Sequence, residues 1–142
     1  MNTSTRHSGF TLIELLAVIA IIGLIGTIGT PAYFRWIATN NTVSAATTLA
    51  QEVTRTRTQV KRSDTAITLK VVNGVSAVVS NRTVTLPNVT VSGTLNLTFV
   101  PPFGTLATGT LTPQTVTLVS SSNPSVTRQV SVVSLFGKVV VK

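Results

Sequence analysis

A single charge inside a long apolar stretch constrains this chain more than any other feature. Between Phe10 and Phe34, a stretch of 25 residues, the only charged residue is Glu14. A helix of about 25 residues is long enough to span a bilayer core of about 30 Å. A carboxylate within such a helix costs roughly 2.5–3.5 kcal/mol on insertion scales. We therefore expect Glu14 to have a specific partner, so that the segment does more than anchor the chain.

The apolar stretch allows three interpretations. A cleaved secretory signal has an apolar region of about 7–15 residues, whereas this stretch is longer and carries Glu14 near its start. A plain transmembrane anchor fits the length but leaves Glu14 unexplained. In the third interpretation the chain is cut before the apolar stretch, after Gly9. The helix then stays in the mature protein, which begins at Phe10.

The residues around Gly9 support the third interpretation, because one run of six resembles a known processing site: Gly9-Phe10-Thr11-Leu12-Ile13-Glu14. The run is similar to the prepilin-peptidase site of type IV pilins and type II secretion pseudopilins. The resemblance implies that residues 1–9 form a leader, that the bond after Gly9 is cut, and that the amine of Phe10 is N-methylated. It also implies that Glu14 is retained and that Pro31 distorts the helix.

Glu14 also has a physical reason to act in assembly. In lipid we expect it to have no partner, whereas in a helical filament it could pair with the Phe10 ammonium of a neighbouring subunit. A buried ion pair adds little net stability but penalises every misaligned register. We therefore expect Glu14 to align subunits. The alternative is a carboxylate that reaches the membrane interface, since Glu14 lies one turn from the start of the stretch.

The flanking charges give an orientation. Arg6 and His7 precede the apolar stretch, and a Lys/Arg bias holds an end in the cytoplasm, although Arg35 flanks the far side. With the resemblance, this predicts a single-pass protein of the inner (cytoplasmic) membrane. Its amino terminus is then cytoplasmic and its β domain periplasmic, until the subunit enters a pilus or pseudopilus filament.

Hydrophobic periodicity divides the rest of the chain. We expect residues 10–37 to form the transmembrane, filament-core half of a helix and residues 38–63 an amphipathic half. An apolar stripe at helical spacing marks the second half: Val43, Ala46, Ala50, Val53 and Val60. Residues 64–142 then alternate with a period of two over seven or eight short strands, with a hairpin signal at Asn73-Gly74. This predicts an α+β fold, one long N-terminal helix packed on an antiparallel β-sheet domain.

The carboxyl-terminal half carries a second resemblance, to minor pseudopilins of the GspH/FimT type. In those proteins a strand-borne Phe, a turn Gly and a terminal Gly-Arg-Val-like strand recur. The matching residues here are Phe99, Phe103-Gly104 and the run Leu135-Phe136-Gly137-Lys138-Val139. Lys138 stands where the family pattern has Arg. Together the two resemblances imply a pilin-like minor subunit.

Composition argues against an enzyme. The chain has no Cys, and its single His7 lies in the predicted leader. The acids other than Glu14 are Glu52 and Asp64, twelve residues apart, which gives no paired-carboxylate geometry. We therefore expect no catalysis, no metal and no cofactor.

The first hypothesis is a structural role in a type IV pilus or a type II secretion pseudopilus. The resemblance implies several partners: the prepilin peptidase, other pilin or pseudopilin subunits, and an inner-membrane assembly platform driven by a cytoplasmic ATPase. The helix would pack in the filament core, with the β domain facing outward or capping the tip.

The second hypothesis is DNA binding for natural transformation. The net charge is +8, and residues 38–142 hold nine Lys/Arg against two acids. Arg128, Lys138 and Lys142 lie on or near the closing strands and could form one DNA- or anion-binding cluster. Lys138 lacks the bidentate phosphate geometry of Arg, and the domain has few aromatics for stacking. A merely solvated basic surface is the alternative.

The end of the predicted helix raises a similar choice. It carries four cations: Arg55, Arg57, Lys61 and Arg62. Cations near a helix C-terminus complement the macrodipole by about 0.3–1 kcal/mol each. The alternative is an anion-binding patch.

Overall fold

The computed structural model describes residues 10–74, 76–79, 82–107 and 113–142. The predicted leader, residues 1–9 with Gly9, lies outside the described residues. The chain divides into two compact units, residues 1–33 and residues 34–142.

One helix, α1, runs from Leu12 to Ser63 and contributes to both units. It continues through Pro31 and ends where Asp64 adopts a left-handed backbone with φ of 51°. Lys61 and Arg62 lie in its last turn, where they complement the helix dipole.

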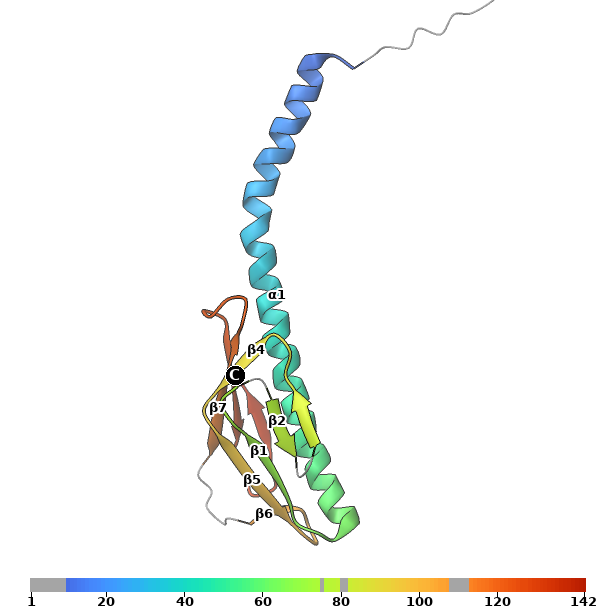
Figure 1. Cartoon of the computed structure of the whole chain (residues 1–142), viewed down its shortest axis with the longest axis vertical. Helices are drawn as coiled ribbons and strands as arrows, with labels where there is room; N and C mark the ends of the chain where they lie inside the picture. Colours follow the sequence, from blue (N-terminus) through green and yellow to red (C-terminus); the bar gives the residue numbers. More distant parts are fainter. Residues whose placement is uncertain (1–9, 75, 80–81, 108–112) are drawn as a thin grey trace, which may run out of the picture. The chain divides into compact units, whose positions relative to one another are not determined.

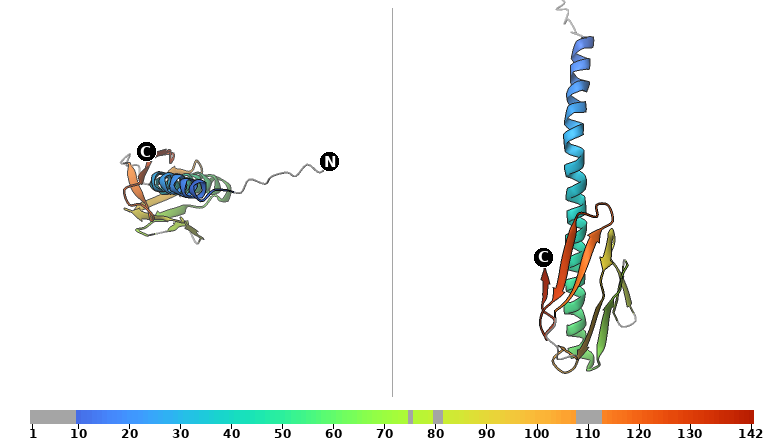
Figure 2. Two further views of the ribbon diagram at one scale, coloured as in Figure 1. Left: turned by 90° about the horizontal axis from the view of Figure 1, so that it is seen from above. Right: turned by 90° about the vertical axis from the view of Figure 1, so that its left-hand side faces the viewer.

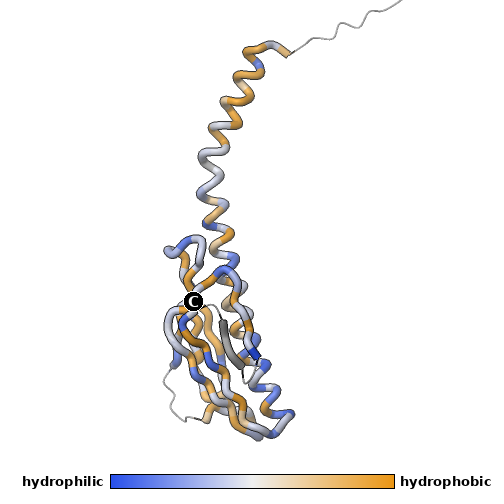
Figure 3. The backbone as a smooth tube through the Cα atoms, viewed as in Figure 1, coloured by the Kyte–Doolittle hydropathy of each residue, from blue (hydrophilic) through white to orange (hydrophobic). Residues whose placement is uncertain are grey.

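The first part of α1 is apolar on all sides. Within the described residues it is the one helix long and apolar enough to cross a membrane, judged by length and composition alone. Its large side chains, such as Ile13 and Leu24, are more than half exposed within the chain. Figure 3 shows the run of hydrophobic residues at this end of the helix. Such a surface needs lipid or other proteins to cover it.

Threonine is frequent along α1 although its β-branch lowers helix propensity. The hydroxyls donate hydrogen bonds to carbonyl oxygens three or four residues earlier. In the apolar part, Thr27 bonds Leu24 at 2.8 Å and Thr30 bonds Gly26 at 2.6 Å. Further along, seven more make the same bond: Thr39, Thr42, Thr47, Thr48, Thr54, Thr56 and Thr58. These threonines therefore keep their polar atoms on the helix and present their methyl groups outward.

Among the described residues of the second unit, nine strands form two antiparallel sheets. Figure 1 shows their arrangement. The first sheet has the order β3-β2-β1-β5-β6. Its strands are β1 (Ile67–Val71), β2 (Ser76–Val79), β3 (Arg82–Thr85), β5 (Leu95–Val100) and β6 (Thr105–Leu106). The second sheet has the order β4-β7-β8-β9. Its strands are β4 (Val89–Ser92), β7 (Gln114–Ser120), β8 (Thr127–Val132) and β9 (Val139–Val141).

The core lies between the carboxyl-terminal part of α1 and the two sheets, which lie beside this part of the helix in both views of Figure 2. In β1, β4, β5, β7 and β8 the buried residues alternate along the strand, as the period of two requires. Leu49 from the helix, Leu97 and Phe99 from β5, and Leu118 from β7 are almost fully buried. The predicted α+β fold, one long N-terminal helix packed on antiparallel sheets, is confirmed.

The predicted helix stripe was partly wrong. Ala46, Val53 and Val60 are buried, but Val43 is 43% exposed and its neighbour Thr42 is fully buried instead. Valine's hydrophobicity suggested the first position, whereas the geometry of the helix places Thr42 on the buried face. Its hydroxyl is compatible with burial because it donates to the carbonyl of Thr39 at 2.9 Å.

The hairpin after β1 also differs in detail. Strands β1 and β2 pair as expected, but Val71 pairs with Ala77, so the connection is longer than a two-residue Asn-Gly turn. Gly74 instead forms a bridge with Val91 of the other sheet. The Asn73 side chain accepts a hydrogen bond from the Gly93 N–H at 2.7 Å. Asn73 and Gly74 therefore join the two sheets.

Candidate functional site

The carboxylate of Glu14 is held by Thr11 at the start of α1. The Thr11 N–H and hydroxyl donate to Glu14 Oε2 at 3.0 and 2.8 Å. The Glu14 N–H donates to Thr11 Oγ1 at 3.3 Å. This reciprocal arrangement is a capping box, which satisfies backbone donors that a helix start leaves unpaired.

We expected Glu14 to have no partner in lipid, but within the single chain its carboxylate already accepts hydrogen bonds from Thr11. Thr11 was not identified as a site residue, although the Thr-x-x-Glu spacing is itself the signature of a capping box. Only one carboxylate oxygen, Oε2, takes part in these bonds. A pairing of Glu14 with a neighbouring Phe10 amine stays a prediction.

Two other predicted residues, one for processing and one for assembly, lie just before and within the same helix. Phe10 precedes the helix and is 85% exposed. Pro31 lies inside α1 and has no N–H to donate to the carbonyl of Thr27. The helix continues past it, so within this single chain Pro31 removes one helical hydrogen bond without ending the helix.

The three predicted basic residues lie on the β8–β9 hairpin. Lys142 and Gln129 exchange two backbone hydrogen bonds of 2.9 Å, and the Val133 N–H donates to the Lys138 carbonyl at 2.9 Å. Lys138 and Lys142 therefore lie on one face, at opposite ends of β9, about 13 Å apart at about 3.3 Å per residue. Arg128 is half-buried and shares the opposite face with Val130 and Val132. The register thus does not bring all three onto one face.

An ion pair connects the helix to the edge of the first sheet. Glu52 on α1 is 8% exposed, and its Oε2 accepts a hydrogen bond from Arg82 Nη2 of strand β3. Arg55 Nη1 lies 3.9 Å from the other carboxylate oxygen. Glu52, one of the two acids in residues 38–142, is therefore already paired within the fold. This pair was not predicted from the sequence.

The residues of the second resemblance make two close contacts with α1. Gly137 has φ of 68°, and a Cβ there would lie 2.8 Å from the Phe99 ring and 3.5 Å from Val53 Cγ1. Gly104 has φ of 62°, and a Cβ would lie 2.8 Å from Arg57 Cγ. Both positions thus require glycine for backbone conformation and for space. Phe99 is fully buried, and the turn that contains Gly137 packs against its ring.

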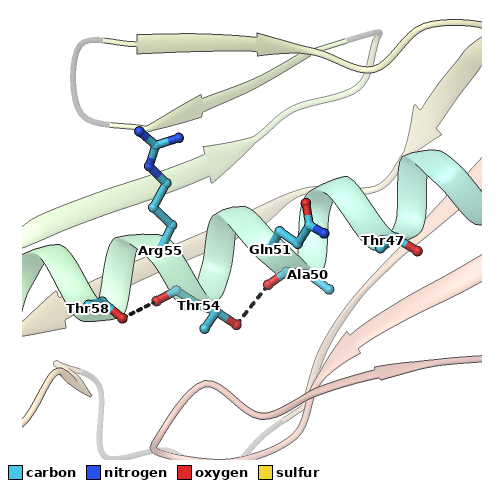
Figure 4. Close-up of a pocket in the computed structure, with 6 residues that line it drawn as sticks. All are labelled: Thr47, Ala50, Gln51, Thr54, Arg55 and Thr58. Carbon is cyan, nitrogen blue, oxygen red and sulfur yellow. Dashed lines mark hydrogen bonds between the residues drawn. The ribbon is translucent and has the colours of Figure 1, made fainter.

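A shallow hollow of about 470 Å³ lies on the helix itself. Its lining is Thr47, Ala50, Gln51, Thr54, Arg55 and Thr58, all from α1 (Figure 4). The hydroxyls of Thr54 and Thr58 donate hydrogen bonds to carbonyl oxygens of the helix. Among the residues that line the hollow, Arg55 carries the one charge. Across residues 10–74, 76–79, 82–107 and 113–142, no three His, Cys, Asp or Glu residues lie close enough to hold a metal ion.

Residues 4–30 match the family model of the prokaryotic N-terminal methylation motif. The match covers the predicted cut after Gly9, Glu14 and most of the apolar stretch. No curated protein sequence matches this chain.

Two solved structures share the fold, both of the type IV minor pilin FimU of Pseudomonas aeruginosa. The structure in space group P21 has a TM-score of 0.57 at 19% identity and covers 72% of this chain and 89% of that chain. The structure in space group P65 has a TM-score of 0.53 at 19% identity, covering 70% and 90%. The chain therefore has the fold of a type IV minor pilin behind a methylation motif.

Proposed function

We propose that this chain is a minor subunit of a type IV pilus or of a type II secretion pseudopilus. One observation carries the proposal: the methylation motif leads directly into a helix that continues into a domain with the fold of a type IV minor pilin. The role that we propose is structural.

The processing steps follow from the motif. Prepilin peptidase removes residues 1–9 after Gly9, and the new amine at Phe10 is methylated. The apolar part of α1 holds the subunit in the inner membrane, amino terminus cytoplasmic and β domain periplasmic. An assembly platform then moves it into a filament, where other pilin or pseudopilin subunits replace lipid around the same surface. The exposed apolar side chains of this part of α1 support both steps.

Glu14 sets the register during this transfer. In the membrane its Oε2 stays with Thr11, which lowers the cost of a carboxylate in lipid. In the filament the carboxylate pairs with the Phe10 amine of a neighbouring subunit. The pair favours one alignment because a misplaced neighbour leaves two charges without their partner.

Replacing Gly9 tests the cleavage. Gly9→Leu should leave residues 1–9 attached, which mass spectrometry detects as an unprocessed chain, while Ser8→Ala should be processed normally. A Gly9→Leu chain with the mature mass would contradict the assignment.

Replacing Glu14 tests the register role. Glu14→Gln keeps the size and a hydrogen-bond acceptor for Thr11 but removes the charge. The variant should insert into the membrane like the wild type and be depleted from purified filaments.

Recovery of the natural chain in sheared pili assigns it to a pilus, and a secretion defect without pilus association assigns it to a pseudopilus.

A second candidate is DNA binding during natural transformation. It is favoured by the charge of residues 38–142, which hold nine cations and one acid, Asp64, that the fold leaves exposed. Phosphate contacts would give affinity that falls with salt, with a slope of about −0.9 per phosphate on a log–log plot.

A salt series with duplex DNA and the mature chain in detergent tests this candidate. The double variant Lys138→Ala with Lys142→Ala should reduce the slope by about two if both residues contact phosphate. Undetectable binding at low salt, or an unchanged slope, would exclude DNA binding by this pair.

A further inference from the structure

Two turns of the β domain meet at one residue of the helix, Arg57. The turn at Pro101–Gly104 follows β5, and the turn at Ser134–Gly137 precedes β9. Each turn leaves a phenylalanine on the surface, Phe103 at 69% and Phe136 at 53% exposed. We call the set Arg57, Lys61, Phe103 and Phe136 the Arg57 surface.

The first turn is fixed on the helix by Gly104. A Cβ at Gly104 would lie 2.8 Å from Arg57 Cγ, 2.9 Å from the Arg57 carbonyl oxygen and 3.5 Å from Lys61 Cε. The backbone of this turn therefore lies against the stems of both cations. Phe103 directly precedes Gly104 in this turn and is 69% exposed.

The second turn is fixed from three sides. The Arg57 guanidinium carbon lies 5.5 Å from the centroid of the Phe136 ring, within the range of a cation–π contact. Gly137 packs on Phe99, and the Leu135 carbonyl accepts a hydrogen bond of 2.9 Å from the Leu106 N–H. Phe136 thus stays half-exposed although its turn is well anchored.

The Arg57 surface combines features of protein interfaces. Exposed aromatic side chains and Arg are enriched at the centres of interfaces, where rigid anchors carry most of the binding energy. Arg57 Nε is buried without a hydrogen-bond partner among the described residues, so part of its desolvation has already occurred in the free chain. A preorganised surface loses less conformational entropy when it binds.

Charge complementarity identifies the kind of partner. The Arg57 surface presents two cations one helical turn apart and no acid. Outside the apolar stretch the chain has two acids, and Glu52 is buried against Arg82. A second copy of this chain would therefore bring further cations and, apart from Asp64, no exposed acidic side chain to meet them.

We propose that the Arg57 surface docks an acidic region of a different subunit in the same filament. The proposal rests on the proposed function and adds a partner and a contact surface to it. The partner inserts an apolar or aromatic side chain between Phe103 and Phe136 and places carboxylates against Arg57 and Lys61.

The same residues suit a folded protein better than a nucleic acid strand. One face of Phe136 is already covered by the Arg57 guanidinium, so that face is not free to stack on a base. Two cations one turn apart also make no extended track for successive phosphates. A carboxylate, in contrast, matches the planar fork of a single Arg.

Photocrosslinking in the cells that make the filament tests the proposal. The full-length chain carries p-benzoyl-phenylalanine at position 103, whose shape is close to that of Phe103, or at the exposed control position 90. The adduct at position 103 should contain an acidic protein with its own methylation motif, identified by mass spectrometry. Adducts only with the same chain, with nucleic acid or with lipid would overturn the proposal, as would no adduct.

Charge reversal supplies the matched control. Lys61→Glu should lower the adduct yield by about tenfold or more, because like charges then face each other. Lys70→Glu makes the same change at an exposed position on β1 and should leave the yield unchanged. Equal yields in the two variants would overturn the electrostatic assignment. Leader removal is followed in the same cells: normal removal without the acidic adduct overturns the surface alone, and failed removal in the wild type overturns the proposed function as well.

Discussion

The two parts of helix α1 treat the same problem of apolar surface in opposite ways. From Leu12 to Tyr33 the large apolar side chains are exposed within the chain. From Phe34 to Ser63 the buried residues form one stripe, with Leu49 and Val53 in contact with the β domain core. The first part depends on lipid or other subunits, whereas the second is completed by its own chain. A single helix thus carries one surface for assembly and one for folding.

The same Leu→Ala change, made once in each part of α1, should show the largest difference between the two parts. Leu49→Ala should reduce the free energy of unfolding of the β domain by about 2–5 kcal/mol, because it leaves a cavity in a fully buried site. Leu24→Ala, at a site 68% exposed, should change it by less than about 0.5 kcal/mol. Hydrogen exchange of the β5 and β7 amides measures both values in the detergent-solubilised chain. Equal losses of unfolding free energy would contradict the assignment of one part of α1 to assembly and the other to folding.

Gly→Ala substitutions in the β domain and in the apolar part of α1 should have opposite effects on stability, the second-largest expected difference. Gly137→Ala should cost about 2–4 kcal/mol, since φ of 68° disfavours a side chain and the new Cβ meets the Phe99 ring. Gly26→Ala meets no atom within 4 Å and should strengthen the helix, by up to about 1 kcal/mol. The same exchange measurement, extended to the amides around residue 26, tests the two signs. A Gly137→Ala chain as stable as the wild type would show that the closing turn does not rest on Phe99.

The two glutamates on α1 should then differ in what they control. Glu52→Gln should destabilise the β domain by about 1–2 kcal/mol, less than for a fully buried pair because Arg82 is half-exposed. Glu14→Gln should leave β domain stability unchanged and reduce filament incorporation. Urea unfolding and filament recovery, measured on both variants, give the crossed comparison. A stability loss for Glu14→Gln would contradict the separation.

The smallest effect should come from the cap at the helix start. Thr11→Val removes the hydroxyl and should cost about 0.5–2 kcal/mol locally, with faster exchange confined to the first turn of α1. Thr11→Ser, which keeps the hydroxyl, is the control. Unchanged hydrogen exchange in Thr11→Val would show that the Thr11 hydroxyl does not hold Glu14.

The long-period features of the chain could be predicted from sequence, and the short-range ones only in part. The long apolar stretch, the helical spacing over residues 38–63 and the period of two over residues 64–142 are strong signals, and the α+β fold was predicted from them. Thr42 was missed because a buried hydroxyl depends on a local carbonyl, and β6, only two residues long, gives no periodic signal. The Glu52–Arg82 pair joins residues thirty positions apart and required the fold. The register of β8 and β9 likewise separates Arg128 from Lys138, which lie near each other in sequence.

The threonine hydroxyls that bond back to α1 have a consequence for movement between solvents. Thr27 and Thr30 in the apolar part, and Thr54 and Thr58 further along, already have an acceptor for their proton within the helix. A hydroxyl satisfied in this way needs no new donor or acceptor when lipid, water or protein replaces its surroundings. At these positions, extraction of the helix from a bilayer therefore replaces the contacts of methyl groups and breaks none of these hydroxyl hydrogen bonds.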